Sequence, residues 1–515
     1  MRPNQPSFFA AAALCLAAGA AHAATDTSRV IVMFKPGAAA AGRAAVATAQ
    51  GRVVHQIEGM DAVSIEVPAQ ALKGLAHNPN VEYIEEDVKR YPLGGTSPST
   101  GAPYATGQLV PYGIKMVQAD QLPDTYAANR KICIIDSGYS RGHEDLDADA
   151  SRITGEYDSG TGWWYTDENH HGTHVAGTIA ALNNAGVGVV GVNPNRQLKL
   201  HIVKVFGADG WAYSSTLATA ANKCGAAGAN IITMSLGGSR SNKTEEKAFA
   251  TLAAKNVLSI AAAGNDGTRA ASYPAGYASV VSVAALDENK AWASFSQYNS
   301  KVELAAPGVN VLSTVPMGAG SASSLTVGGV AYAPGGMEGS PKSTATATLA
   351  DFGLGDTTNA AVSGKVCLIA RGSVDFATKV SNCQASGGVG AVVYNNVAGG
   401  FSGTLGTTVT DIPSVTASDT EGAALKNQLG QSATVAVTAT NYAFYDGTSM
   451  ATPHVSAVAA LVWSYFPSCT AAQIRSTLDK SAEDLGAAGR DVKFGYGLVR
   501  AKAAYDRIAS LGCGN

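Results

Sequence analysis

The chain has 515 residues, enough for about three domains of ordinary size. Its 36 Lys and Arg residues nearly balance 39 Asp and Glu residues, so the formal net charge is only −3. No basic run is present that could follow a phosphate backbone or an anionic membrane, which argues against both as partners. Glycine contributes 58 residues and charged residues only 15% of the chain, a composition common in compact, loop-rich exported enzymes.

The first residues have the pattern of an export signal. Arg2 gives a positive start, residues 8–20 form an apolar stretch too short to span a bilayer, and Ala21-His22-Ala23 reads as a small-residue cleavage site. A buried N-terminal helix is the alternative, but a core helix does not need such a site. We therefore expect residues 1–23 to be a signal peptide and the product to be secreted, extracellular or periplasmic in transit.

Seven cysteines include Cys15 in the expected signal, so six remain in the exported chain. An even number suits an oxidising compartment, but six cysteines allow 15 pairings, and sequence alone does not choose among them. A buried free thiol is the alternative for Cys133, which lies in an apolar run. The pairing that nests most simply is Cys133 with Cys224, Cys367 with Cys383, and Cys469 with Cys513.

Residues 24–92 are expected to form a small α+β domain, and residues 93–107 a linker. Strand patterns occupy residues 29–35, 62–67 and 81–88, and helix-prone runs occupy residues 38–50 and 68–77. The linker is mainly Gly, Ser, Thr and Pro, which leaves backbone accessible to proteases. We expect maturation cleavage there.

From about Val110 the pattern changes to short apolar strands separated by helical stretches. The strand sequences are KICIID, KLHIVKVF, ANIITMSL, VLSIAAAG and VVSVAA. Near-continuous apolar strands between helices favour a three-layer α/β fold, with a parallel sheet covered on both faces. Further helices are expected at 448–465 and 470–481. We assign residues 108–317 and 442–515 to this domain.

The composition shifts again between residues 318 and 441. This segment is rich in Gly, Ser, Thr, Ala and Val, has few charges, and contains strand-like runs such as KVCLIA, GAVVYNN and ATVAVTA. We interpret residues 318–441 as a β-rich domain inserted into the α/β domain.

Three segments of the α/β domain carry residues that together suit amide hydrolysis. Asp136 ends an apolar strand, so its carboxylate is expected at the carboxyl edge of the sheet, where sites form. His171 and Ser449 each stand at a helix start, and at Ser449 free N–H groups favour developing negative charge. A serine nucleophile needs a base, a carboxylate that orients the base, and oxyanion donors. Asn265 and the Ser449 backbone N–H are the expected donors.

Taken singly, each residue has a structural explanation: a turn-forming aspartate, a capping histidine and an N-cap serine. Their joint occurrence favours catalysis. A peptide-binding protein that has lost its activity is one alternative, but all four positions are filled. A lipase or esterase of the α/β-hydrolase type is another, but it expects G-x-S-x-G and the order Ser, acid, His, whereas this chain has GTSMA and the order Asp, His, Ser.

Five longer blocks resemble the signatures of the subtilisin-like serine peptidases: DSGY at 136–139, HGTHVAGT at 171–178, MSLGG at 234–238, AAAGNDG at 261–267 and GTSMATPHV at 447–455. The resemblance covers about residues 108–481 apart from the insertion. It implies a serine endopeptidase that works through an acyl-enzyme and needs no cofactor for catalysis. The implied roles are orienting acid for Asp136, general base for His171, nucleophile for Ser449 and oxyanion donor for Asn265; His174 is expected to pack on its helix.

The resemblance also implies two binding sites. It places substrate backbone along Ser235-Leu236-Gly237 and Ala262-Ala263-Gly264, with a preference for a large apolar or aromatic side chain before the cut. Tight sheet-to-helix packing is the alternative for these small residues.

A structural calcium ion is implied at Gln108, Asp145, Asn184 and carbonyls of residues 182–189. That loop is one residue longer than the usual pattern, and a solvated turn is its alternative reading.

The flanking units resemble known companions of this catalytic domain. Residues 29–91, through VIVMFKPG and VEYIEEDV, resemble an inhibitory propeptide, which implies a self-processing zymogen; a permanent small domain is the alternative. Residues 364–372 and 385–396 resemble part of a protease-associated domain, for which substrate gating, substrate binding and mere packing stay open. The expected partners are protein or peptide substrates and the chain's own propeptide, with the enzyme itself a monomer.

Overall fold

The computed structural model describes residues 27–96 and 107–515. The expected signal peptide, residues 1–23, and the linker residues 97–106 lie outside the described residues. The chain forms two compact units: the first contains the residues up to Gln56 and Asp61–Ile84, and the second contains Ile57–Met60 and Glu85–Asn515.

The N-terminal unit is a four-stranded sheet with two helices packed on it. Val32, Phe34, Val46 and Leu75 belong to its core, and an added Cβ on Gly42 would lie 2.2 Å from the Phe34 ring, so this glycine permits the close approach of the first helix. The expected small α+β domain is confirmed, although one strand at residues 52–57 was not predicted. In sheet order its strands are β2 (Arg52–Ile57), β3 (Ala62–Pro68), β1 (Thr27–Phe34) and β4 (Val81–Glu86); its helices are α1 (Ala39–Thr48) and α2 (Leu72–Ala76).

The second unit is built on a seven-stranded sheet in which every pairing is parallel. All five strands predicted from apolar runs are present, and two strands at the sheet edges were not predicted. In sheet order the strands are β17 (Val302–Pro307), β16 (Val280–Leu286), β15 (Leu258–Ala262), β13 (Ile231–Met234), β7 (Lys131–Asp136), β11 (Lys199–Lys204) and β8 (Ile153–Gly155).

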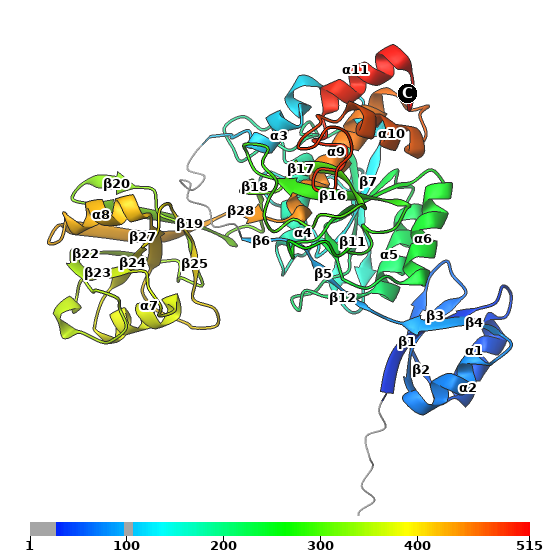
Figure 1. The fold of residues 1–515 in the computed structure, drawn as a ribbon, viewed down its shortest axis with the longest axis horizontal. Helices are drawn as coiled ribbons and strands as arrows, with labels where there is room; N and C mark the ends of the chain where they lie inside the picture. The colour runs from blue at the N-terminus through cyan, green and yellow to red at the C-terminus, as the bar shows by residue number, and fades with distance from the viewer. Residues whose placement is uncertain (1–26, 97–106) are drawn as a thin grey trace, which may run out of the picture. The chain divides into compact units, whose positions relative to one another are not determined.

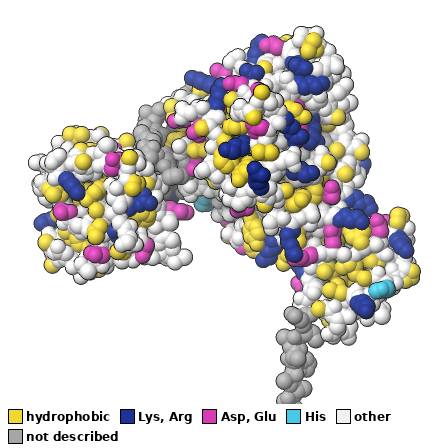
Figure 2. Space-filling view, viewed as in Figure 1, with side chains coloured by type: hydrophobic (Ala, Val, Ile, Leu, Met, Phe, Trp, Pro, Cys, Tyr) yellow, Lys and Arg dark blue, Asp and Glu magenta, His cyan; other side chains and the backbone are white. Residues whose placement is uncertain are grey.

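Helices cover both faces of this sheet, which confirms the three-layer α/β prediction (Figure 1). On one face lie α4 (His171–Ala180), α9 (Thr448–Tyr465), α10 (Ala471–Ser481) and α11 (Ala501–Leu511). On the other face α5 (Ser214–Ala226) packs beside α6 (Lys243–Ala254). Lys and Arg side chains are interspersed with Asp and Glu on the face shown in Figure 2.

Short elements surround the parallel sheet. A short helix, α3, spans Tyr112–Met116. Two further small sheets have the orders β12-β5-β14 and β18-β28-β6, and β9 pairs with β10. The strands are β5 (Lys89–Pro92), β6 (Gly95–Thr96), β9 (Tyr157–Asp158), β10 (Gly162–Trp163), β12 (Ala212–Tyr213), β14 (Leu236–Gly237), β18 (Val311–Thr314) and β28 (Tyr442–Asp446).

The segment interpreted as an insertion leaves and re-enters the α/β domain between β18 and β28, which pair with each other. It has a seven-stranded sheet of its own with an apolar core on each face, and its strands are more numerous than its helices. The strands are β19 (Gly320–Val327), β20 (Val330–Tyr332), β21 (Met337–Glu338), β22 (Thr344–Asp351), β23 (Val366–Ala370), β24 (Gly390–Tyr394), β25 (Gly403–Thr404), β26 (Ser414–Ala417) and β27 (Ser432–Thr440); the helices are α7 (Phe376–Ala385) and α8 (Asp419–Lys426).

Three disulfides are present, and they are the three that the simplest nesting predicted. They join Cys133 to Cys224, Cys367 to Cys383, and Cys469 to Cys513. The first connects β7 to α5 inside the core, the second lies within the inserted segment, and the third fastens Cys513 to the turn between α9 and α10. Within residues 27–96 and 107–515, no helix has the length and apolarity that a bilayer crossing requires.

The C-terminal disulfide provides a stability test. In a Ser449→Ala background, the double variant Cys469→Ser/Cys513→Ser should lose about 2–4 kcal/mol of unfolding free energy, because the bond closes a long loop in the unfolded chain. Calorimetry should show a lower Tm for the α/β domain. The variant Cys367→Ser/Cys383→Ser is the control, since its bond is confined to the inserted segment. An unchanged Tm in the first variant would contradict the expectation.

Candidate active site

Asp136 and His171 meet at the carboxyl edge of the parallel sheet. Asp136 is the last residue of β7 and His171 the first residue of α4, and both side chains are buried. His171 Nδ1 donates to Asp136 Oδ1 over 2.8 Å. The same carboxylate oxygen accepts from the Ser137 amide over 2.7 Å. Within the described residues, His171 Nε2 has no hydrogen-bond partner, so it is available to a further group.

The start of helix α4 is fixed by a second aspartate that sequence reasoning missed. Asp167 accepts hydrogen bonds from the His170 and Thr173 amides, at 2.8 Å each, and from the Thr173 and Ser137 hydroxyls. These bonds satisfy amides that a helix start leaves unpaired. An Asp four residues before the histidine, with Thr173 two residues after it, is the local signal that was available. Asp167 therefore holds the histidine-bearing turn in place.

The pKa of His171 reflects two opposing effects. Burial disfavours the charged ring, but the Asp136 carboxylate and its hydrogen bond outweigh burial and raise the pKa of His171 above its ordinary value. Burial lowers the pKa of His174 to about 3, and this ring stacks on Tyr445 and donates from Nε2 to the Val311 carbonyl oxygen. His174 thus packs against strands β18 and β28.

Ser449 is the second residue of α9 and is held by reciprocal hydrogen bonds with Ser235. The Ser449 hydroxyl donates to the Ser235 carbonyl oxygen over 2.7 Å, and the Ser235 hydroxyl donates to the Ser449 carbonyl oxygen over 2.7 Å. That second carbonyl would bond the amide four residues later in a regular helix, but position 453 is a proline and has no N–H. The Ser235 hydroxyl replaces the missing donor.

The side-chain amide of Asn265 is oriented by the residue before Ser449. Asn265 Oδ1 accepts from the Thr448 amide over 2.9 Å and from the Thr448 hydroxyl over 2.8 Å, which turns Nδ2 in the opposite direction. Nδ2 donates to the Leu93 carbonyl oxygen over 2.8 Å. The Ser449 amide donates to the same oxygen over 3.0 Å. Two donors thus converge on one carbonyl beside the serine, as an oxyanion site requires.

The residues before Leu93 lie as a strand between two edges of the α/β domain. β5 is antiparallel to β14 on one side, with Leu236 opposite Pro92, and to β12 on the other, with Ala212 opposite Arg90. The Leu93 amide donates to the Ser235 carbonyl oxygen over 3.1 Å. An added Cβ on Gly237 would lie 2.8 Å from the Leu93 side chain. The segment 235–237 therefore lies against a bound extended chain.

The second predicted binding segment, Ala262-Ala263-Gly264, is buried, and two of its amides donate to groups other than the bound strand β5. The Ala263 amide donates to the Val283 carbonyl oxygen in the core, and the Gly264 amide to the Thr448 hydroxyl. The edge strand Ala212–Tyr213, in contrast, was not predicted to bind. Two residues give no strand pattern that a sequence reading can recognise.

Two carboxylates upstream of β5 bind helix N-termini of the α/β domain. Glu85 accepts from the Lys243 and Thr244 amides at the start of α6, over 2.7 and 2.8 Å. Asp87 accepts from the Ser215 amide at the start of α5, over 3.0 Å, and from the Ser214 and Ser215 hydroxyls. Negative charge is favoured at such positions. Both contacts therefore hold residues 85–93 in the groove between β12 and β14.

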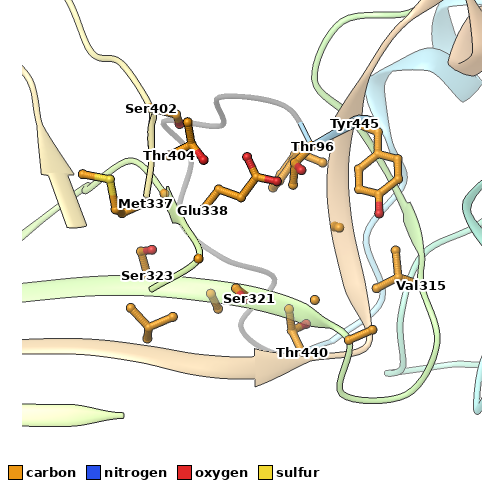
Figure 3. A pocket seen from close by; sticks show the side chains of 18 of the residues that line it. Thr96, Val315, Ser321, Ser323, Met337, Glu338, Ser402, Thr404, Thr440 and Tyr445 are labelled. Carbon is orange, nitrogen blue, oxygen red and sulfur yellow. The ribbon is translucent and has the colours of Figure 1, made fainter. Parts of the chain in front are cut away.

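Downstream of Leu93 the chain continues along β28 toward a cavity. Gly95 and Thr96 form β6, which is antiparallel to β28 with Thr96 opposite Tyr445. The cavity has a volume of about 560 Å³ and is lined by Thr96, Tyr445 and residues of the inserted segment, among them Met337 and Glu338. In Figure 3 the Glu338 carboxylate extends toward Thr96. The inserted segment thus lines the space just beyond the bound strand.

The residues predicted to hold calcium gather around one oxygen-rich position. Gln108 Nε2 lies 2.8 Å from the Leu182 carbonyl oxygen, 3.2 Å from Asn184 Oδ1 and 3.3 Å from the Val187 carbonyl oxygen. Asp145 Oδ2 accepts from the Val189 amide, whereas its buried Oδ1 has no hydrogen-bond partner within the described residues. Burial raises the pKa of Asp145 to about 7. Carbonyl, amide and carboxylate oxygens are the donors that Ca²⁺ takes.

Comparison with known proteins agrees with this geometry. The subtilase family model matches residues 127–354 and 357–497, and the model of the fervidolysin N-terminal prodomain matches residues 27–87. The chain therefore belongs to the subtilase family.

Individual relatives support the same assignment. An alkaline protease of Alkalihalobacillus alcalophilus is 38% identical over 268 residues, which are 51% of this chain and 64% of that protein; the chain thus spans less than two thirds of the length of this curated relative. The crystal structure of the psychrophilic subtilisin-like protease Apa1 from Pseudoalteromonas sp. AS-11 has a TM-score of 0.61 at 43% identity, over 79% of this chain and all of that one. Fervidolysin of Fervidobacterium pennivorans shares the fold, with a TM-score of 0.59 at 22% identity over 94% of this chain and 61% of that one.

The Asp136–His171 pair predicts a change in titration. Replacing Asp136 with Asn removes the carboxylate that raises the pKa of His171, so this pKa should fall, and burial alone should then hold it below the ordinary value. The pKa of His171 is measured by NMR of isotope-labelled histidine, with and without the Asp136 replacement, in a Ser449→Ala background. His454 is the control, since burial lowers its pKa to about 4 without a contribution from Asp136, and this pKa should be the same in both proteins. An unchanged His171 pKa would show that Asp136 does not act on the ring.

Proposed function

We propose that this chain is the zymogen of a secreted serine endopeptidase that cleaves itself between Leu93 and Gly94 and then cleaves other proteins. The carbonyl oxygen of Leu93, which accepts hydrogen bonds from the Ser449 amide and Asn265 Nδ2, is the observation that carries the proposal. An added Cβ on Gly94 would lie 3.0 Å from the Ser449 Cβ, so the residue after this carbonyl also touches the serine. The bond next to the serine is thus Leu93–Gly94.

In the proposed reaction, Asp136 keeps the proton on His171 Nδ1 and leaves Nε2 as the base. The Ser449 hydroxyl rotates away from the Ser235 carbonyl and gives its proton to Nε2 as its oxygen attacks the Leu93 carbonyl carbon. The charge that develops on the carbonyl oxygen is held by the Ser449 amide and Asn265 Nδ2. His171 then protonates the Gly94 nitrogen as the peptide bond breaks. Water hydrolyses the acyl-enzyme by the same steps in reverse.

The proposal also includes inhibition by residues 24–93 after the cut. The bonds of Glu85 and Asp87 to helix starts and the pairing of β5 with two edges do not involve the Leu93–Gly94 bond. They persist when that bond breaks, so the released segment continues to fill the groove. Activity on other proteins then requires its removal or digestion.

The cleavage position within the expected linker follows from these contacts. Cleavage was expected within residues 93–107, and the contacts at the Leu93 carbonyl favour the first bond of that segment. Leu93 also agrees with the expected preference for an apolar side chain before the cut.

Export of a monomeric enzyme is part of the proposal. The three disulfides support an oxidising destination, and the pattern of residues 1–23 supports a signal peptide.

We propose further that Ca²⁺ binds at Gln108, Asp145 and Asn184, with the Leu182 and Val187 carbonyls. A single amide nitrogen does not satisfy this many oxygens, because Gln108 Nε2 has only two hydrogens. Rotation of the Gln108 side-chain amide by half a turn brings Oε1 inward as another ligand. An ion there would also pair with the buried Asp145 Oδ1. Its role would be to fix the loop after α4.

Processing is the test of the main proposal. Purified wild-type protein should yield a product whose first residue is Gly94, as mass spectrometry and N-terminal sequencing report, and should digest an unfolded protein. Ser449→Ala should stay uncut and inert because no acyl-enzyme forms. Ser510→Ala, an exposed serine of α11, is the control and should behave as wild type. A product that begins between residues 97 and 107 would refute the proposed bond, and self-cleavage by Ser449→Ala would refute the nucleophile.

The calcium proposal is tested by chelation in the Ser449→Ala background. Removing the ion should lower the Tm by about 2–4 °C for each kcal/mol of binding free energy lost, and added Ca²⁺ should restore it. Asp145→Asn should show a smaller response to the chelator. A Tm that is the same in excess Ca²⁺ and in chelator would contradict the site.

A further inference from the structure

The bound segment carries an arginine whose charge is completely buried. Arg90 is the fourth residue before the proposed scissile bond, counted from Leu93 as the first, and its side chain has 0% exposure. Its neighbour Tyr91 is 47% exposed, as expected where successive side chains of a strand face opposite sides. A guanidinium removed from water needs a matched partner, because an unpaired buried charge is strongly unfavourable. The groove therefore contains a specific site for this side chain.

The partner is Glu245, which is also 0% exposed. Arg90 Nε donates to Glu245 Oε1 over 3.0 Å and Nη2 donates to Oε2 over 2.6 Å, a bidentate pair. The Tyr277 hydroxyl donates to Glu245 Oε2 over 2.6 Å. The planar guanidinium fits two carboxylate oxygens at once, whereas a lysine ammonium offers one point charge. The site is thus built for arginine in particular.

The α/β domain supplies this site in advance. Glu245 is the third residue of α6, where the N-terminus favours a carboxylate, and its amide donates to the N-cap side chain of Asn242 over 2.9 Å. Tyr277 accepts from the Asn242 amide over 2.8 Å, which fixes its hydroxyl toward Glu245. An added Cβ on Gly238 would lie 3.0 Å from Arg90 Nη1, so Gly238 leaves room for the guanidinium. None of these three supports belongs to the bound segment.

A substrate that pairs with β14 and β12 in the same register as residues 90–92 would place a side chain in the Arg90 site. A substrate with its reactive carbonyl between Ser449 N and Asn265 Nδ2, extended along β14 and β12, has its fourth residue opposite Ala212, where Arg90 lies now. When that residue is not arginine, Glu245 loses its only bidentate partner within the described residues and stays buried. The enzyme would discriminate between substrates through the cost of leaving the buried Glu245 carboxylate unpaired as much as through its attraction for arginine.

We propose that Glu245 is a specificity-determining residue, and that the enzyme prefers protein substrates with an arginine at the fourth position before the cut and an apolar residue at the first. The proposal rests on the proposed function. The expected preference for arginine over alanine is about 100-fold in kcat/KM, within the range for loss of one partner of a buried, hydrogen-bonded charge pair.

The test uses mature wild-type enzyme and a series of fluorogenic peptides based on residues 89–96, with Arg, Lys, citrulline or Ala at the position of Arg90. The expected order of kcat/KM is Arg first, Lys second, and citrulline and Ala last, since citrulline has the shape of arginine without its charge. Equal cleavage of the Arg and Ala peptides would overturn the proposal, and the Arg90–Glu245 pair would then serve only to retain the propeptide.

Variants locate the effect. Glu245→Gln should reduce the ratio of Arg to Ala cleavage toward one, whereas Glu246→Gln, an exposed neighbour on the same helix, should keep the wild-type ratio. If Glu245→Gln does not mature, the wild-type peptide series decides alone. If the enzyme cleaves none of the peptides and also fails to digest unfolded protein, the proposed function is overturned and this proposal with it. Cleavage of all peptides at one rate overturns this proposal only.

Discussion

The burial of helix α9 is the constraint on which the site depends. Every residue from Thr448 to Ser464 is buried, and the helix packs against β13, β15 and β16. A helix enclosed on all sides has no freedom to slide, so its first turn stays at the carboxyl edge of the sheet. Parallel strands end at that same edge, which brings Asp136 at the end of β7 and Asn265 after β15 to Ser449 without any local sequence relation among them. The geometry of the site is a consequence of the fold's core.

The same edge also determines how residues 85–93 bind to the α/β domain. Residues 85–93 use the pairing edges, the helix N-termini and the oxyanion donors that the α/β domain offers to any extended chain. A sheet of distant parallel pairings forms slowly, and a segment that binds only the assembled edge favours the assembled state. Recognition of the segment combines main-chain pairing with side-chain contacts of Glu85, Asp87 and Arg90.

Local sequence patterns were sufficient for much of this architecture. Helix 448–465, the strand that ends at Asp136 and the four other apolar strands were predicted because apolar runs determine burial directly. The edge strands β8 and β17 were missed, since β8 has three residues and β17 contains Glu303 and Pro307. The Arg90–Glu245 pair lies 155 residues apart along the chain, and the Ser235–Ser449 pair 214 apart. Such contacts depend on tertiary packing, and no periodicity of a single segment encodes them.

The attachment of the inserted segment has an evolutionary consequence. Its two connections are extensions of the neighbouring strands β18 and β28, and β19 and β27 continue that pairing into the segment. A domain joined in this manner is an enlarged hairpin loop, and lengthening a loop costs little entropy once its ends are adjacent. Such a module can be gained, exchanged or lost without altering the register of the parallel sheet. Because β28 also pairs with Gly95 and Thr96, exchange of the module would change the surroundings of these two residues and leave Asp136, His171 and Asn265 in place.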